Sequence, residues 1–317
     1  MAITTTDIVT EYGAFYQDAG QNKKRILTML SQGREITNFA TPIKTDDTIY
    51  RLANATFRTL VQPFQKTFTA KGGVDLVPNE IRQYRFKIDD EFMPDELYAT
   101  WLGFLTQKSV DRKDWPFVKW LIEVYYANQI DQDMELNEYY KGVYAAPTAG
   151  TAGNDGTGMD GIQKILKDGV DAGTINSINI GALDKTTIFD QVESFTDAIS
   201  EVYQGIKMNV FMSHKWYKKY LQDKRSQGYY QRTSDQQIDG KIDFTPLDVK
   251  PLASMVGTDD IFCTPQINFL HVSPATITKN MFKIEEAKRA VAVMADWSEG
   301  LGFGINQAVW TNIQKTV

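Results

Sequence analysis

The sequence predicts an α+β fold, because helical and strand-like patterns follow one another in mixed order and no internal repeat is visible. Apolar residues recur every three or four positions between residues 187 and 204, which is the period of an amphipathic helix. They alternate with polar residues between 84 and 89 and again between 289 and 297, which is the period of a strand. Residues 147–158 (PTAGTAGNDGTG) are rich in turn-forming residues and predict a linker.

The first segment, residues 1–34, predicts two short helices. Thr6 is placed to cap the first helix, and residues 22–32 form the second. The apolar face of the first helix consists of Ile8, Tyr12 and Phe15. Helices this short are marginal on their own. We therefore expect both to dock on the rest of this chain or on a neighbouring molecule.

Residues 35–92 predict a long β-hairpin. The stretch is rich in Thr, Phe, Ile and Val, and its tip is expected to contain Gly72 and Gly73. The returning strand is expected to carry Tyr84, Phe86 and Ile88 on one face. A two-stranded ribbon is marginally stable in isolation. An extended ribbon is therefore expected to lie across a partner.

The returning part of this hairpin carries charges of both signs. We expect these charges to face complementary charges on an adjacent subunit, where they would set the register of the contact more than its affinity. An ordinary solvated strand face is the alternative interpretation. The predicted inter-subunit contacts are Arg82, Arg85, Lys87, Asp89, Asp90 and Glu91.

Residues 94–140 are expected to be helical. Pro94 suits the first position of a helix, and Asp114 is placed to cap a second one. The apolar stripe of the second helix consists of Val118, Leu121, Ile122, Tyr125 and Tyr126. Together these features predict a long helix, with or without an interruption. The helix over 187–204 begins at Thr187, which resembles one half of a capping box with Asp190.

The last third of the chain predicts strands around one further helix. Alternating apolar residues from Ile206 to Met212 predict a strand, and Ser213 caps the helix that follows. Residues 235–275 are loop-rich with short strands. The strand at 289–297 is expected to be followed by a final strand pair after Gly300.

Composition excludes several classes of function. A net charge of −6 argues against binding of a phosphate backbone as the main task, although it allows a protein that encloses nucleic acid without gripping it. The single cysteine, Cys263, precludes an internal disulfide and suits a reducing compartment. No apolar run approaches the ~20 residues of a membrane span, and the N-terminus does not resemble a signal peptide. The 17 Phe and 15 Tyr suit either protein contacts or a Tyr-rich core.

Two motifs that resemble binding or catalytic sites lack the rest of their signature. The glycines of 150–158 precede a helix as in a phosphate loop, but no Lys-Ser/Thr pair follows. Ser213 and His214 are adjacent, whereas a nucleophile and its base must meet through space, so Ser213 is better interpreted as a helix cap. The chain has only two histidines and one cysteine, which are too scattered to form a zinc site.

Acidic clusters are equally uninformative about catalysis. Asp131, Asp133 and Glu135 alternate like the start of a calcium loop, but Leu136 stands where that loop needs glycine. Glu285 and Glu286 would point to opposite sides of a strand. The sequence therefore predicts no catalytic residue, no cofactor and no metal, and a protein that is not an enzyme.

Two stretches carry a resemblance to a known family. In residues 209–230 (NVFMSHKWYKKYLQDKRSQGYY), a buried strand, a polar cap and an aromatic-bearing helix lead into a Lys-Asp-x-x-Gly-Tyr-like turn. Residues 288–313 (KRAVAVMADWSEGLGFGINQAVWTNI) are similar to the closing strands of the same family. With the order of elements along the chain, these stretches resemble the major capsid proteins of tailed bacteriophages, which have the Hong Kong 97-like fold.

The resemblance implies a plan for the whole chain. Residues 1–34 would be an N-terminal arm and 35–92 an extended β-hairpin loop. Residues 93–205 would form the spine helix and peripheral domain, 206–275 the axial domain, and 276–317 strands that return to the peripheral domain. Many relatives begin with a long cleavable scaffold segment that this sequence lacks, so a separate scaffold protein or a matured form is expected.

The implied function is that of a structural subunit, with hexamers and pentamers forming the icosahedral head around double-stranded DNA that is enclosed without specific binding. Implied partners are the portal and the scaffold or decoration proteins of the same phage, with no membrane. The location is the virion, after assembly in the cytoplasm of the host bacterium. Alternatives are an encapsulin-like protein cage, a tail or baseplate protein, and a soluble hydrolase. The hydrolase would show a deep pocket with convergent carboxylates of perturbed pKa.

Overall fold

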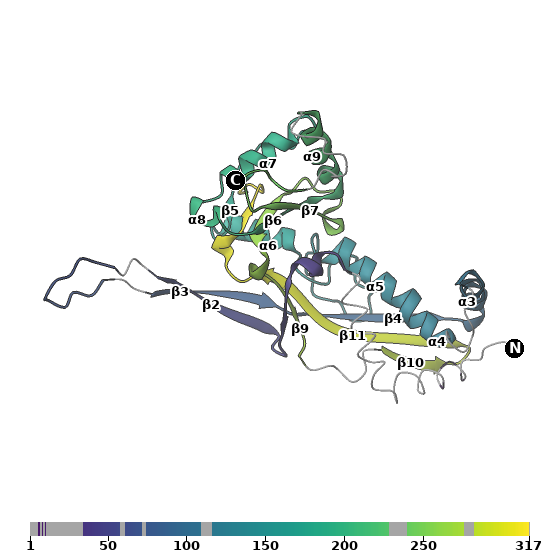
Figure 1. Ribbon diagram of the computed structural model, residues 1–317. Coiled ribbons are helices and arrows are strands. Elements are labelled where there is room, and N and C mark those ends of the chain that lie inside the picture. The colour runs from purple at the N-terminus through teal and green to yellow at the C-terminus, as the bar shows by residue number, and fades with distance from the viewer. Residues whose placement is uncertain are drawn as a thin grey trace.

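The structure is a computed structural model in which two lobes and a projecting hairpin are distinct (Figure 1). It describes residues 6, 8, 10, 34–57, 61–71, 74–108, 116–227, 240–275 and 282–316. Most of the two expected N-terminal helices, Gly72 and Gly73, and the expected cap Asp114 lie outside the described residues. Ile8, from the expected apolar face of the first helix, is fully buried.

A five-stranded sheet forms the lower lobe. Its strands run in the order β1 (Thr41–Lys44), β9 (Phe269–Ser273), β11 (Ala290–Phe303) and β10 (Phe282–Ala287), and β4 (Tyr84–Phe92) also pairs with β11. The β1–β9 pair is parallel, and β11 is antiparallel to β4, β9 and β10. The long strand β11 pairs with β4 over residues 291–299 and with β9 over residues 300–303, so it joins the two halves of the sheet.

The expectation that one strand ends before Gly300 and new strands begin after it is wrong, because β11 continues through Gly300 as one strand of 14 residues. The glycine permits a close approach of two segments. A Cβ atom at position 300 would lie 2.1 Å from the carbonyl oxygen of Arg82. A glycine therefore serves here to let another backbone approach, and not to make a turn.

The projecting hairpin consists of β2 (Ile49–Phe57) and β3 (Val74–Arg82), which pair antiparallel along their full lengths. It ends earlier than expected. The strand with Tyr84, Phe86 and Ile88 is β4, which pairs with β11 in the lower lobe and not with β2. Gln83 makes the corner between them, since its side-chain amide donates to the carbonyls of Thr45 (2.7 Å) and Asp47 (3.0 Å).

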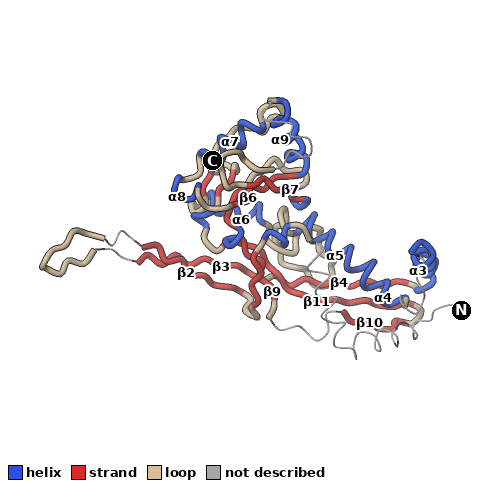
Figure 2. The backbone as a smooth tube through the Cα atoms, viewed as in Figure 1, coloured by secondary structure: helices blue, strands red, loops and turns tan. Residues whose placement is uncertain are grey.

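A long helical run lies against one face of the lower sheet (Figures 1 and 2). It comprises α4 (Phe117–Trp120), η3 (Leu121–Tyr126), α5 (Ala127–Asp133) and η4 (Met134–Glu138), of which η3 and η4 are π-helical turns. The part of the expected long helix that follows Asp114 is confirmed. Its apolar stripe is buried except for Tyr125, which is 45% exposed. A separate helix, α3 (Pro94–Lys108), follows β4 at the far end of the lobe (Figure 1).

The upper lobe contains a second five-stranded sheet. Its order is β5 (Asn176–Ser177), β12 (Trp310–Thr311), β8 (Phe262–Pro265), β6 (Met208–Ser213) and β7 (Asp248–Leu252). Helices α6 (Ile162–Asp171), α7 (Ile188–Asp197), α8 (Glu201–Gln204) and α9 (His214–Ser226) belong to this lobe (Figure 1). Short 3₁₀ turns complete it and the junction: η2 (Ile36–Phe39), η5 (Ala253–Met255), η6 (Gln266–Asn268) and η7 (Asn306–Ala308).

One expectation about the upper lobe is confirmed and one is wrong. The strand expected around residues 206–212 is β6, which is buried at every position because it lies inside a sheet covered on both faces. The helix expected over 187–204 ends at Asp197, and Val202 in the separate α8 is 82% exposed. Asp223 on α9 accepts a hydrogen bond from the backbone N–H of Phe189 at 3.0 Å, whereas Thr187 makes no side-chain cap.

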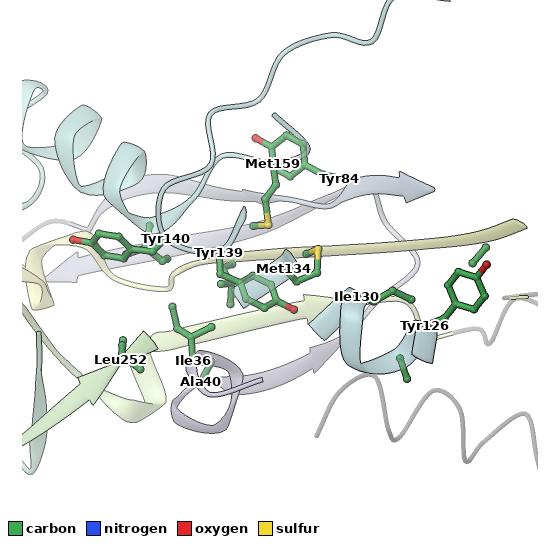
Figure 3. Close-up of a cluster of buried hydrophobic side chains, with 14 of the residues drawn as sticks. Ile36, Ala40, Tyr84, Tyr126, Ile130, Met134, Tyr139, Tyr140, Met159 and Leu252 are labelled. Atoms are coloured by element: carbon green, nitrogen blue, oxygen red, sulfur yellow. The ribbon is translucent and has the colours of Figure 1, made fainter. Parts of the chain in front are cut away.

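The main apolar core fills the space between the helical run, the lower sheet and the junction with the upper lobe. Figure 3 shows part of it, where Ile36 and Leu252 gather near Tyr139 although they are distant in the sequence. A second core lies around β6, α7 and α9. In the part of the chain that the structure describes, no helix is long and apolar enough to cross a bilayer.

Candidate assembly surfaces

The tip of the hairpin, residues 61–71, exposes a set of large apolar side chains. Val61 is 84% exposed, Phe64 92% and Phe68 93%. The tip is nonetheless a closed loop, because the side-chain amide of Gln62 donates to the carbonyl of Thr69 at 2.9 Å, and the Lys71 ammonium donates to the carbonyl of Val61 at 2.6 Å. Burial of one such side chain stabilises a protein by ~1.5–3 kcal/mol. The exposed apolar side chains make the tip a candidate contact surface.

Of the six predicted inter-subunit contacts, only Arg82 lies on the projecting hairpin, at its base. The other five lie on β4 and belong to the lower sheet, which corrects the expectation that they are part of the hairpin. The side chains on the exposed face of β4 are those of Arg85, Lys87, Asp89 and Glu91. Their role as contacts between subunits stays a prediction.

Local partners already hold some of these charges. Lys87 forms an ion pair with Asp89, whose hydrogen bond and negative charge raise the pKa of the lysine. Asp90 takes the opposite direction from its neighbours and accepts a hydrogen bond from the Tyr126 hydroxyl at 2.7 Å. Arg82 is exposed, with its guanidinium 5.3 Å from the centre of the Tyr84 ring. Arg82 and Asp90 thus help to fix the two ends of β4.

A buried polar cluster, which the sequence reasoning missed, surrounds Arg34. The guanidinium donates to Glu299 at 2.6 Å, to Asp131 at 2.9 Å and to the Tyr139 hydroxyl. Burial alone would lower the pKa of Arg34, but the negative charges of Glu299 and Asp131 raise it above its ordinary value. The cluster joins Arg34, which lies shortly before η2, to α5, to Tyr139 directly after η4, and to β11.

Glu299 is the most densely bonded member of this Arg34 cluster. It accepts hydrogen bonds from the Tyr139 hydroxyl and the Trp297 indole, each at 2.7 Å, and His271 lies 3.0 Å away. Burial alone would raise the pKa of Glu299, but the positive charge of Arg34 and the hydrogen bond to His271 hold it well below its usual range.

The Arg34 cluster tests the hydrolase alternative, because its carboxylates converge and have perturbed pKa values. Burial also raises the pKa of Asp131, despite its bond to Arg34. However, Glu299 is only 3% exposed, and both of its oxygens accept hydrogen bonds from protein groups. A carboxylate enclosed and saturated in this way has no lone pair for a substrate. The arrangement suits a structural connection.

The glycine-rich linker binds a carboxylate from its own chain. One or other oxygen of Glu138 accepts hydrogen bonds from the backbone N–H groups of Gly156 (3.0 Å), Gly158 (2.9 Å) and Met159 (3.2 Å). Burial raises the pKa of Glu138 in spite of these bonds. The backbone donors that would cradle a phosphate are thus bound to Glu138, in agreement with the interpretation as a linker.

The other candidate motifs also have structural partners. Glu135 accepts hydrogen bonds from the backbone N–H groups of Ile36 and Ser254, each at 3.2 Å. Ser213 occupies the N-cap position of α9 as expected but makes no side-chain cap, because its hydroxyl donates to the carbonyl of Thr258. Burial raises the pKa of Cys263. Among the described residues, no group of three His, Cys, Asp or Glu side chains could hold a metal ion.

Comparison with known proteins gives matches in structure alone. No family model matches this sequence, and no curated protein matches it significantly. A chain of the satellite phage P4 procapsid has a TM-score of 0.59 at 12% identity, covering 92% of this chain and 91% of its own length. The capsid of an empty GTA particle gives 0.55 at 11%, covering 90% and 91%. A structure from Gordonia phage Cozz gives 0.50 at 11%, covering 89% and 86%. The chain therefore has the fold of tailed-phage capsid proteins, as its sequence resemblance predicts.

Proposed function

We propose that this chain is the structural subunit of a phage head, and that hexamers and pentamers of it form a closed icosahedral shell around double-stranded DNA. The projecting hairpin carries the proposal, because Phe64 and Phe68 at its tip are almost fully exposed on a chain with a capsid fold. A two-stranded ribbon is marginal alone, and a neighbouring copy that covers its tip would stabilise it.

The charged face of β4 is proposed as a second contact between subunits. Arg85, Lys87, Asp89 and Glu91 would oppose charges of an adjacent copy, with Arg82 and Asp90 fixing the ends of the strand that presents them. Such charges steer encounter and set register. Reversal of the charges at Arg85 and Lys87 should therefore impair assembly, and unchanged assembly would exclude this contact.

Further parts of the proposal concern partners and location. A net charge of −6 suits a shell that lets DNA slide during packaging, because a strongly basic lumen would bind the phosphate backbone. The portal and the scaffold or decoration proteins of the same phage would join the subunit. Assembly would take place in the host cytoplasm, and the final location would be the virion.

The experiment is electron microscopy of the purified protein, alone and with its neighbouring phage proteins, together with size-exclusion chromatography. Closed shells, or rings of five and six, are expected, with nuclease-protected DNA in shells made in the complete phage system. A uniform monomer or small dimer in every condition would refute the proposal. Shells with a co-purifying enzyme and no DNA would favour an encapsulin-like cage, and open tubes or single rings would favour a tail protein.

A further inference from the structure

A short segment before β1 lies between the two lobes. It consists of residues 34–39, which we call the strap, and it includes η2. On the side of the lower lobe, Arg34 forms its buried ion pair with Glu299 of β11. The backbone N–H of Ile36 donates to Glu135 of η4 at 3.2 Å. The strap is therefore fastened both to the lower sheet and to the helical run that covers it.

The same strap also contacts the upper lobe. The ring of Phe39 lies 5.4 Å from that of Phe211 on β6, in an edge-to-face arrangement. Glu35 accepts a hydrogen bond from the backbone N–H of Ala253, the first residue of η5, at 2.7 Å. The ring of His214, at the start of α9, lies 3.4 Å from the same carboxylate. One strap thus bridges elements of both lobes.

Two carboxylates meet at the start of η5. Glu35 accepts from Ala253 and Glu135 from Ser254, so consecutive N–H groups hold two negative charges. Burial raises the pKa of Glu135, and the charge of Glu35 acts in the same direction, so the charged form of Glu135 is kept there at a cost. Glu135 also lies in the π-helical turn η4, a distortion that is frequent at functional sites. The contact with η5 is therefore suited to reversible release.

We propose that the strap is a latch between the lobes: while Glu35 and Glu135 hold η5, the orientation of the upper lobe is fixed, and when the strap leaves η5 the upper lobe pivots on the lower one. One oxygen of Glu135 bonds the strap and the other bonds η5, so a displacement of the strap disturbs both contacts. The hydroxyl of Tyr140 donates to Asp260 at 2.9 Å without involving the strap, and this connection serves as the pivot.

The latch gives the N-terminal segment control over the upper lobe. Because the strap follows directly on residues 1–33, a change in the position of those residues is transmitted through it to η5. This inference goes beyond the proposed function, since it concerns the single subunit and not its contacts with other copies.

Hydrogen exchange at single-residue resolution tests whether the strap opens as a unit. Glu35→Ala is expected to raise the exchange rates of the Ile36 and Ser254 amides by at least about tenfold, although both donate to Glu135, because one opening exposes all the amides that the latch holds. Glu135→Gln should in turn raise the exchange rate of Ala253, which donates to Glu35. Amides of β4 that pair with β11 should exchange as in wild type.

A distance measurement tests the pivot. Spin labels on Gln132→Cys and Lys218→Cys report on exposed positions of the lower helical run and of α9. The native Cys263 is fully buried and stays unlabelled. Pulsed electron paramagnetic resonance should give a narrow distribution of distances in the otherwise wild-type chain. The distribution should be broader or shifted when Glu35→Ala or Glu135→Gln is added.

The matched control is Asp133→Asn, which removes an exposed carboxylate of the same helical run that bonds Gln129 at 3.0 Å. It should change neither measurement, and circular dichroism should show that every variant is folded. Faster exchange only at the amide bonded directly to the replaced residue, or an unchanged distance distribution in both variants, would overturn the inference. Neither result touches the proposed function. Conversely, wild-type protein that forms no ring or shell would overturn the proposed function and leave the latch intact.

Discussion

Replacement of Arg34 by methionine should be among the most damaging single changes in the chain. The substitution removes the guanidinium that bonds Glu299 at 2.6 Å and Asp131 at 2.9 Å, and it leaves a buried carboxylate without its counter-charge. Removal of one partner of a buried ion pair costs about 3–5 kcal/mol. For a domain of this size such a loss lowers the melting temperature by roughly 10 °C.

The assay is urea unfolding followed by circular dichroism, at a concentration where light scattering reports a monomer. Arg51→Met is the matched control, because Arg51 pairs with Glu80 at 3.0 Å while its side chain is 74% exposed. An exposed pair of this kind contributes at most about 1 kcal/mol. Equal effects of the two substitutions would refute the structural role assigned to the Arg34 cluster.

The dependence on pH gives an independent check. Because the pKa of Glu299 in the folded protein lies below its ordinary value of 4.5, its contribution to stability is present above that value and is lost as the pH falls below it. In Arg34→Met, burial is expected to raise the pKa of Glu299 instead. The difference in stability between wild type and variant should therefore be largest near neutral pH and shrink in acid, and a constant difference would contradict this account.

Three further predictions follow from local geometry. Gly300→Ala should destabilise the monomer by about 1–3 kcal/mol in urea unfolding, because the added Cβ would clash with the carbonyl of Arg82. The control Gly205→Ala should leave the stability unchanged, because the space around Gly205 is open. Asp223→Ala should lower the free energy of unfolding by about 1 kcal/mol, because α7 loses its cap, and Thr187→Ala should lower it by less. A larger effect of Thr187→Ala would instead support the capping box that the sequence predicts. Phe68→Ser should leave monomer stability unchanged but raise the assembly concentration about tenfold or more in sedimentation velocity; unchanged assembly would exclude the tip as a contact.

Local periodicity was sufficient for much of the fold. The spacing of apolar residues predicts the long helical run, and Val118, Leu121 and Ile122 are buried in it as expected. Alternation likewise predicts a strand over residues 84–89, and β4 contains it, with Tyr84 buried and Phe86 and Ile88 half-buried on one face. Such patterns reflect the geometry of a single element, which is set within a few residues of the chain.

The candidate contact surfaces were predicted only in part. The ribbon and its charges are visible in the sequence, but most of the charges proved to lie on β4, because β11 rather than β2 pairs with that strand. An alternating pattern shows which face of a strand is apolar, but it does not show which other strand forms hydrogen bonds with it. The aromatic tip residues carry a signal that was available, namely two phenylalanines in a turn-rich polar segment, but only the structure shows them to be exposed.

The sequence by itself determined the fold class, the main helix and strand periods, the absence of catalytic motifs and the resemblance to capsid proteins. The tertiary structure alone decided which strands pair, where α7 ends and what caps it, and that Arg34 meets Glu299 across 265 positions. The reason is physical. Periodicity reports how one element divides its residues between core and solvent, whereas pairing, long-range caps and buried ion pairs depend on which elements the folded chain brings together.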